Sequence, residues 1–126
     1  MKLDYNCVRN ILLTVESLEY GETLCNKNFL SFELLKDYSK EQMEYTVLRL
    51  SESGYIPITS ATEMIGGLIY SIDALTWEGH QYLDCIRNQN VWDEVLKKVS
   101  GFGNVPFRIL TETAFTLIRL KFGLSN

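Results

Sequence analysis

Residues 4–18 carry apolar side chains at the three- and four-residue spacing of an amphipathic helix. A stripe of this kind is typical of a helix that packs one face on a hydrophobic core. The pattern therefore predicts a core helix that ends near Tyr20-Gly21. The apolar positions are Cys7, Val8, Ile11, Leu12, Leu13 and Val15.

The clearest helix signal lies between Lys40 and Ser53. Ser39 and Gln42 have the spacing of a capping box, in which each side chain satisfies a free backbone N–H of the first turn. Gly54 stands where helices often end in a left-handed residue. The predicted buried stripe consists of Met43, Val47 and Leu50.

Short runs of β-forming residues flank this helix. Residues 28–35 (NFLSFELL) fit either a short strand or a helical turn, and a strand is the favoured interpretation. Residues 55–59 and 68–74 predict a β-hairpin whose loop contains Gly66-Gly67. Because Pro57 has no N–H, it is expected at an edge or an unpaired position of the first strand.

Three further helices are predicted after the hairpin. Thr76 can cap the first, at residues 77–87, and Asn90 with Asp93 indicates the start of the second. The segment SGFGN, residues 100–104, is the best linker in the chain. The buried positions predicted for the first two helices include Tyr82, Leu83, Ile86, Trp92, Val95, Leu96 and Val99.

The last predicted helix runs from Pro106, which suits a first helical turn, to Gly123. It is apolar on nearly all sides, and a domain this small cannot easily bury such a helix. We therefore expect the surplus apolar surface to hold a homodimer together. The main stripe is Phe107, Leu110, Ala114, Leu117 and Ile118, and the further residues of this association helix are Ile109, Phe115, Leu120 and Phe122.

The order of elements predicts a mainly α fold with a small β-hairpin (α+β). A helix followed directly by a two-stranded hairpin is the core of a winged helix, expected at residues 1–88, and a C-terminal helical extension is expected at 90–124. A length of 126 residues suits one domain, so residues 1–126 are predicted to form a single domain.

The chain is acidic, with a formal net charge of -4 and a pI of about 5.0. This charge counts against DNA binding, although a local basic patch can still bind phosphate. The three widely spaced cysteines favour reduced thiols over a disulfide framework or a zinc site. The absence of a long apolar run or a signal-peptide core predicts a cytoplasmic protein with no membrane partner.

No group of residues in the sequence points to an enzyme. His80 is the only histidine, so it cannot build a multi-His metal site, and on a helix it would point away from Cys85. Gly66-Gly67 lacks the lysine and the helix start of a phosphate-binding loop. We expect no catalytic residue, no metal, no cofactor and no small-molecule substrate.

The helix at residues 40–53 occupies the position of the recognition helix in a winged helix. Its outward face has two carboxylates, which phosphate would repel, together with Tyr45 and Leu48, which suit a protein interface. The residues predicted to contact duplex DNA or a protein partner are Lys40, Glu41, Tyr45, Leu48, Arg49 and Glu52.

Three segments of the chain carry a family resemblance. Residues 75–80 (LTWEGH) resemble the LTxxG signature that often ends the wing in winged-helix regulators. Together, MKLDYNCVRNILLTVES, DYSKEQMEYTVLRLSESGYI and LTWEGHQYLDCIRNQNVWDEV resemble the prophage-associated family called domain of unknown function 2513. The resemblance implies a bacterial or phage cytosolic protein with a winged-helix core, and it implies no reaction.

Two functions fit these expectations. The conventional role of a phage or prophage winged-helix protein is that of a DNA-binding transcriptional regulator, an argument by analogy of fold. The alternative is a protein-interaction module that modulates a host or defence factor without binding DNA. An acidic surface of such a module could also mimic nucleic acid.

Overall fold

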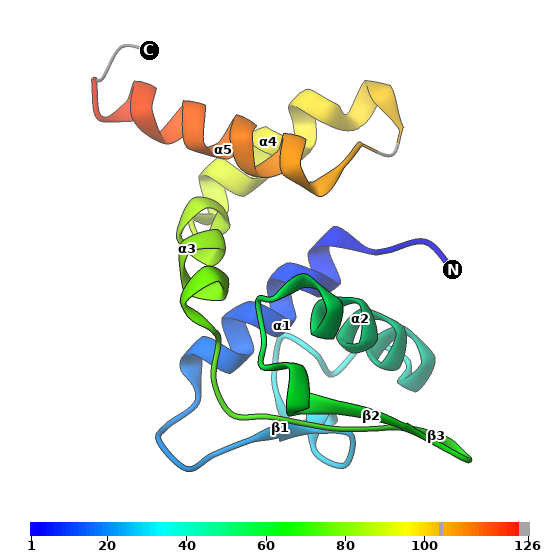
Figure 1. Cartoon of the computed structure of the whole chain (residues 1–126). Helices are drawn as coiled ribbons and strands as arrows, with labels where there is room; N and C mark the ends of the chain where they lie inside the picture. The colour runs from blue at the N-terminus through cyan, green and yellow to red at the C-terminus, as the bar shows by residue number, and fades with distance from the viewer. Residues whose placement is uncertain (104, 124–126) are drawn as a thin grey trace. The chain divides into compact units, whose positions relative to one another are not determined.

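The computed structural model describes residues 1–103 and 105–123, and its mainly helical α+β fold confirms the predicted fold class (Figure 1). The chain divides into two compact units, Met1–His80 and Gln81–Asn126. The predicted extension to residue 124 and the end of the predicted linker at residue 104 lie outside the described residues. The prediction of one domain over 1–126 stays a prediction.

The first unit begins with helix α1, Tyr5–Ser17. The Asp4 side chain caps it, because Oδ1 accepts hydrogen bonds from the N–H groups of Asn6 (2.8 Å) and Cys7 (3.1 Å). The predicted apolar positions are buried except Leu13, which is partly exposed, and Ile11 and Leu12 are fully inaccessible. The core helix expected at residues 4–18 is therefore confirmed.

The strand predicted at residues 28–35 is wrong. The strand of this region is β1, Leu24–Cys25, and Phe29–Ser31 forms a 3₁₀ turn. Asn28 explains the difference, because its Oδ1 accepts from the Cys25 N–H (2.8 Å) and its Nδ2 donates to the Thr23 carbonyl (2.8 Å). These two bonds close the chain into a turn immediately after β1.

Helix α2, Lys40–Ser53, has the predicted bounds. The Ser39 hydroxyl accepts from the Gln42 N–H at 3.1 Å, but Gln42 does not return the bond and donates to Asp4 Oδ2 at 3.4 Å instead. Gly54 ends the helix with a φ of 84°, the left-handed conformation that glycine adopts without strain. The predicted stripe of Met43, Val47 and Leu50 is buried.

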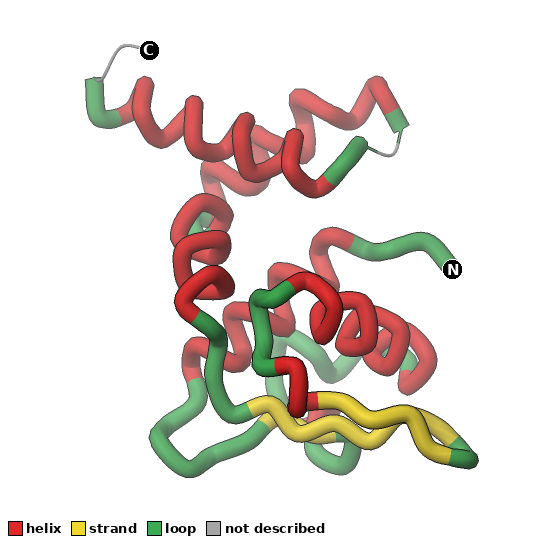
Figure 2. The backbone as a smooth tube through the Cα atoms, viewed as in Figure 1, coloured by secondary structure: helices red, strands yellow, loops and turns green. Residues whose placement is uncertain are grey.

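The hairpin consists of β2, Ala61–Met64, and β3, Gly67–Ile72 (Figure 2). Its first strand was predicted too early in the chain. Residues 58–60 form a 3₁₀ turn instead, closed by a 2.9 Å hydrogen bond from the Ser60 N–H to the Pro57 carbonyl. Strands β1 and β2 both pair antiparallel with β3, which gives the sheet order β1-β3-β2.

The segment LTWEG, residues 75–79, contains the start of helix α3, Trp77–Ile86. Hydrogen bonds hold this segment to the residues that follow α2. The Thr76 N–H donates to the Tyr55 carbonyl (3.1 Å), the Thr76 hydroxyl donates to the Gly54 carbonyl, and the same hydroxyl accepts from the Gly79 N–H (3.1 Å). A Cβ on Gly79 would lie 2.2 Å from the Tyr55 carbonyl oxygen. The motif therefore needs a hydroxyl at position 76 and no side chain at position 79.

In the second unit, helix α4 is Gln89–Val99, and its cap lies two residues before Asn90, the predicted cap. Its cap is Asn88, whose Oδ1 accepts from the Val91 N–H at 3.1 Å. Helix α5, Phe107–Lys121, follows a 3₁₀ turn at Ser100–Phe102. Phe107 at its start lies against Tyr82, with 4.6 Å between the ring centroids, and Lys121 at its end pairs with Glu94 on α4 at 3.2 Å.

Candidate functional site

A groove between helix α2 and the β2–β3 hairpin is the candidate site in the first unit. Figure 1 shows the hairpin lying beside α2. The groove encloses about 380 Å³, within the roughly 300–1,000 Å³ of typical binding pockets. It is lined by Met1, Glu41, Glu44, Tyr45, Leu48, Glu63, Met64, Gly67 and Leu68.

Helical and strand periodicity bring these side chains together. Positions 41, 44, 45 and 48 have the i, i+3, i+4, i+7 spacing of one helical face. On the hairpin, Glu63 pairs with Leu68 across the two strands, so these two residues lie on the same face of the sheet. Leu68 is buried on that face, whereas Glu63 is exposed.

Glu44 connects the helix to the hairpin. Its Oε1 accepts a hydrogen bond from the Leu68 N–H at 3.0 Å and lies 3.9 Å from the Lys40 ammonium group. A Cβ on Gly67 would lie only 2.7 Å from the same oxygen. A side chain at this position would push the end of Glu44 aside, and the φ of 136° is one that residues other than glycine rarely adopt.

The groove has more negative than positive charge. Glu41 and Glu63 form no ion pair with any residue in the described ranges, while Lys40 is already paired with Glu44. Arg49 lies outside the groove, with its Nε 3.0 Å from Glu52 Oε1 and its guanidinium 5.5 Å from the Tyr45 ring centre. Both cations of α2 are thus engaged by groups of the same helix.

The structure divides the predicted recognition face into two parts. Glu41, Tyr45 and Leu48 line the groove, whereas Lys40 contacts its border through Glu44. Arg49 and Glu52 form a separate pair further along the helix. The sequence prediction did not include Glu44, Glu63 or Met64; the spacing of Glu44 from Glu41 and Leu48 was a usable signal, but the hairpin residues required the strand register.

Comparison with known proteins gives the chain a family. A family model described as hypothetical protein (DUF2513) matches residues 2–104. The chain belongs to the DUF2513 family. It is 34% identical over 99 residues to an uncharacterised protein of Haemophilus influenzae strain Rd, a match that covers 75% of each chain. No solved structure matches the chain.

Helix α2 and the hairpin, which form the groove, lie inside the DUF2513 match, whereas Met1 and helix α5 lie outside it. Of the fifteen residues of α5, only Leu110 and Ala114 are buried. The residues predicted for association are all exposed, from Ile109 at 42% to Phe122 at 78%, with Phe115 and Leu120 between them.

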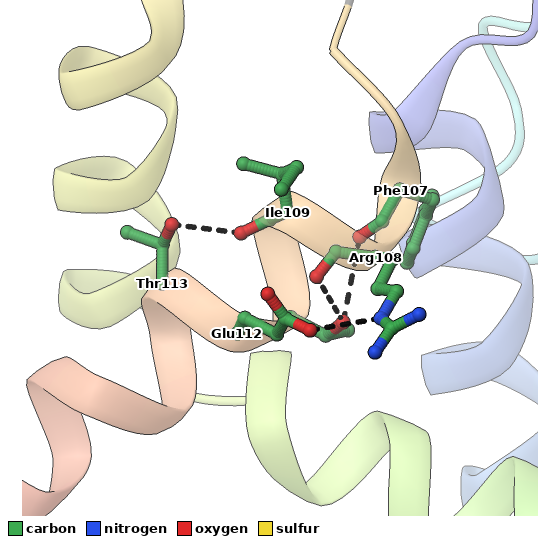
Figure 3. A network of polar contacts seen from close by, with 6 residues as sticks. Phe107, Arg108, Ile109, Glu112 and Thr113 are labelled. Atoms are coloured by element: carbon green, nitrogen blue, oxygen red, sulfur yellow. Dashed lines mark hydrogen bonds and ion pairs between the residues drawn. The ribbon is translucent and has the colours of Figure 1, made fainter.

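Several polar residues of α5 bind one another or the backbone within the helix itself (Figure 3). Arg108 Nε donates to Glu112 Oε1 at 2.8 Å, and the Thr113 hydroxyl donates to the Ile109 carbonyl at 2.7 Å. The Arg119 guanidinium lies 5.8 Å from the Phe115 ring centre. The helix therefore presents exposed apolar side chains to solvent beside charged groups that are already paired.

The outer side of the hairpin is also apolar. Ile69 lies between the buried residues Leu68 and Tyr70 and is about half exposed, at 52%, and Ile65 at the turn is completely exposed. The described hairpin strands and their turn contain no lysine or arginine. A wing that grips a phosphate backbone would be expected to carry such cations.

The ionisable residues expected to be structural lie apart from the groove. Burial raises the pKa of the Cys7 thiol to about 11, against a partial lowering by a hydrogen bond with Thr46. Burial also raises the pKa of Cys85, with a smaller contribution from Asp84. Both thiols are therefore poor nucleophiles at neutral pH. His80 lines a different recess, with Glu16, Glu19 and Asp73 among its neighbours.

Within residues 1–103 and 105–123, no three His, Cys, Asp or Glu side chains are grouped closely enough to hold a metal ion. None of the helices in the same ranges has the length and apolar character needed to cross a bilayer.

Proposed function

We propose that this DUF2513 chain is a non-enzymatic winged-helix protein that acts by binding another protein through the surface formed by α2 and the hairpin. The observation that carries the proposal is the groove itself. It combines the exposed apolar parts of Tyr45, Leu48 and Met64 with carboxylates that lack a cationic partner. Aromatic residues and methionine are enriched in protein interfaces, while carboxylates repel nucleic acid.

The winged-helix part of the proposal is supported by topology. The chain passes through α1, β1, α2 and a two-stranded hairpin, and the outer strands β1 and β2 both pair with β3. The α2 helix stands directly before the hairpin, as a recognition helix stands before its wing. Phage or prophage origin belongs to the same proposal, as does a cytoplasmic location, which the three free thiols favour.

A DNA-binding regulator is the second candidate, and it is favoured by the same topology. The charges weigh against it. The first unit has six Lys or Arg against twelve Asp or Glu, and the two cations of α2 are held by Glu44 and Glu52. Breaking an exposed ion pair costs only up to about 1 kcal/mol, but the carboxylates would remain close to phosphate.

We also propose that α5 mediates homodimerisation. Phe115, Leu120 and Phe122 are exposed on this helix, and Arg108 and Glu112 supply one charge of each sign beside them. In a two-fold symmetric pair the same patch faces itself, so each positive group can meet the negative group of the other copy. The apolar side chains would supply most of the buried area.

A pair of measurements on the full chain tests the partner class. The first is fluorescence anisotropy with a generic duplex DNA at low and moderate salt, where we expect no binding. The second places a photo-crosslinking amino acid at Leu48 or, as a control, at exposed Ser71 on the other side of the sheet. We expect discrete protein adducts in cells from Leu48 alone.

Salt-dependent DNA binding that is lost in Lys40→Ala and Arg49→Ala would replace this proposal with the regulator. Adducts of equal yield from both positions would also contradict a specific interface at the groove.

A further inference from the structure

The side chains that line the groove between α2 and the hairpin indicate the chemistry of the partner that it binds. Of its three carboxylates, Glu44 is occupied twice, by the Leu68 N–H and by Lys40. Glu41 and Glu63 approach the groove from opposite walls, one from the helix and one from the strand, and no described residue pairs with either. The groove therefore has two carboxylates available to a bound cation.

The rest of the groove wall is apolar. Tyr45 and Leu48 contribute from the helix, and Met64 and Leu68 from the hairpin. An inorganic cation or a hydrophilic amine would leave these apolar side chains exposed to water. Long basic side chains match both features, because their methylene stems pack on apolar surface while their charged heads reach carboxylates.

We infer that the groove binds a polypeptide segment of another protein that presents arginine or lysine next to aliphatic side chains. This inference rests on the proposed protein-binding function and names the chemistry of the partner. The basic head lies between Glu41 and Glu63, and a neighbouring aliphatic side chain packs on Leu48 and Met64. Methionine suits such a wall because its flexible side chain adapts to different partners.

Random 12-residue peptides displayed on phage provide the probe. Selection against the full-length protein should enrich peptides that contain Arg or Lys beside Leu, Ile or Val. Synthetic copies of the enriched peptides should bind the wild type at least about tenfold more tightly than the double variant Glu41→Gln, Glu63→Gln, since each substitution removes one charge without changing shape.

The matched control is the double variant Glu16→Gln, Glu19→Gln, which removes the same charge from the same unit at a different recess. Its affinity should stay within about twofold of the wild type, because only charges within roughly 8–10 Å interact strongly in physiological salt. Equal losses in the two double variants would show general attraction to an acidic protein and would overturn the inference.

Other outcomes separate this inference from the proposed function. Enriched peptides without basic residues that still lose binding on Leu48→Glu would overturn the basic partner and keep the protein-binding groove. Peptides affected by neither set of variants, or no enrichment at all, would overturn both. If sedimentation shows that the wild type self-associates and the Glu41→Gln, Glu63→Gln variant does not, the occupant is a second copy of this chain.

Discussion

Helices α1 and α5 are about equally apolar, yet the structure buries them very differently. Seven of the thirteen residues of α1 are buried, against two of the fifteen residues of α5. Helix α1 packs against α2, and the buried core of the same unit also contains Val47, Leu50 and Ile72. In its own unit α5 has α4 as its main partner, and one helix can cover only one side of another.

The two units therefore differ in how many apolar side chains their cores bury and in which side chains remain on the surface to bind a partner. In the first unit the core uses the apolar stripe of α2 and most of that of α1, although Ile58, Ile65 and Trp77 are exposed elsewhere, and the groove has charged walls. In the second unit the apolar pattern exceeds what the described residues cover. Binding at the groove is therefore expected to be selective for charge, and binding at α5 to depend on apolar area.

The two units also differ in charge. The first has six basic and twelve acidic residues, and the second has six basic and four acidic residues. The overall net charge of -4 is the sum of these opposite balances. The unit that contains the candidate site is therefore more acidic than the net charge of the whole chain indicates.

The largest expected effect contrasts the two faces of α5. Leu110 is completely buried, so Leu110→Asp should lower the free energy of unfolding by about 4 kcal/mol or more, because it buries an unpaired charge. Phe115 on the same helix is 53% exposed, so Phe115→Asp should change it by no more than about 0.5 kcal/mol. Urea unfolding followed by circular dichroism measures both.

The same two variants test self-association. Phe115→Asp should shift the sedimentation profile of a concentrated sample towards the monomer while the melting temperature stays the same. A Leu110→Asp protein as stable as the wild type, or a Phe115→Asp protein that unfolds, would show that the burial of α5 has been assigned to the wrong face. An unchanged profile in a folded Phe115→Asp protein would argue against association through this face.

The fold could be predicted from the sequence wherever local signals were strong. Ser39 and Gly54 mark the two ends of α2, and the apolar stripe of α1 reports its buried face directly. The strands were less predictable, because β1 has only two residues and exists through its pairing with β3. The segment NFLSFELL was predicted as a strand from its β propensity. It forms a turn because the Asn28 side chain hydrogen-bonds the backbone at Thr23 and Cys25, an interaction that propensity does not include.

The candidate site shows the same limit. Glu41, Tyr45 and Leu48 follow from the face of one helix, which periodicity predicts. Glu63 and Met64 could not be predicted, since the hairpin was expected to begin six residues earlier and its loop to contain them. A shift of strand register changes which side chains face the helix. The apolar excess of α5, in contrast, was visible in sequence because it requires no long-range pairing.

The second prediction concerns the tight packing of the first unit. A Cβ at Gly79 would lie 2.2 Å from the Tyr55 carbonyl oxygen, which cannot move without breaking its bond with the Thr76 N–H. Gly79→Ala should therefore destabilise the protein by about 3 kcal/mol, despite the better helix propensity of alanine. Differential scanning calorimetry would show a clearly lower melting temperature.

Gly101 in the second unit is the matched control. An added Cβ there meets nothing within 4 Å, and its φ is not in the left-handed region. Gly101→Ala should leave the melting temperature unchanged or slightly higher. If Gly79→Ala were equally harmless, the close contact between α3 and the end of α2 would not exist in solution.

The smallest of the three effects uses pH to probe the core of the first unit. Burial raises the pKa of Cys7 to about 11 from an ordinary value of 9.0, so between these values the unfolded chain loses the thiol proton while the folded chain keeps it. Stability is then fully present below pH 9 and falls as the pH rises, by about 2 kcal/mol between pH 8 and pH 10.5. Urea unfolding at the two pH values measures the loss.

Tyr38 and Tyr70, whose pKa values burial also raises, add to this loss of stability in the same direction. Cys7→Ala should remove the thiol's share and keep theirs, so a variant with the full pH dependence of the wild type would show that Cys7 is not held in the dry interior beside Thr46.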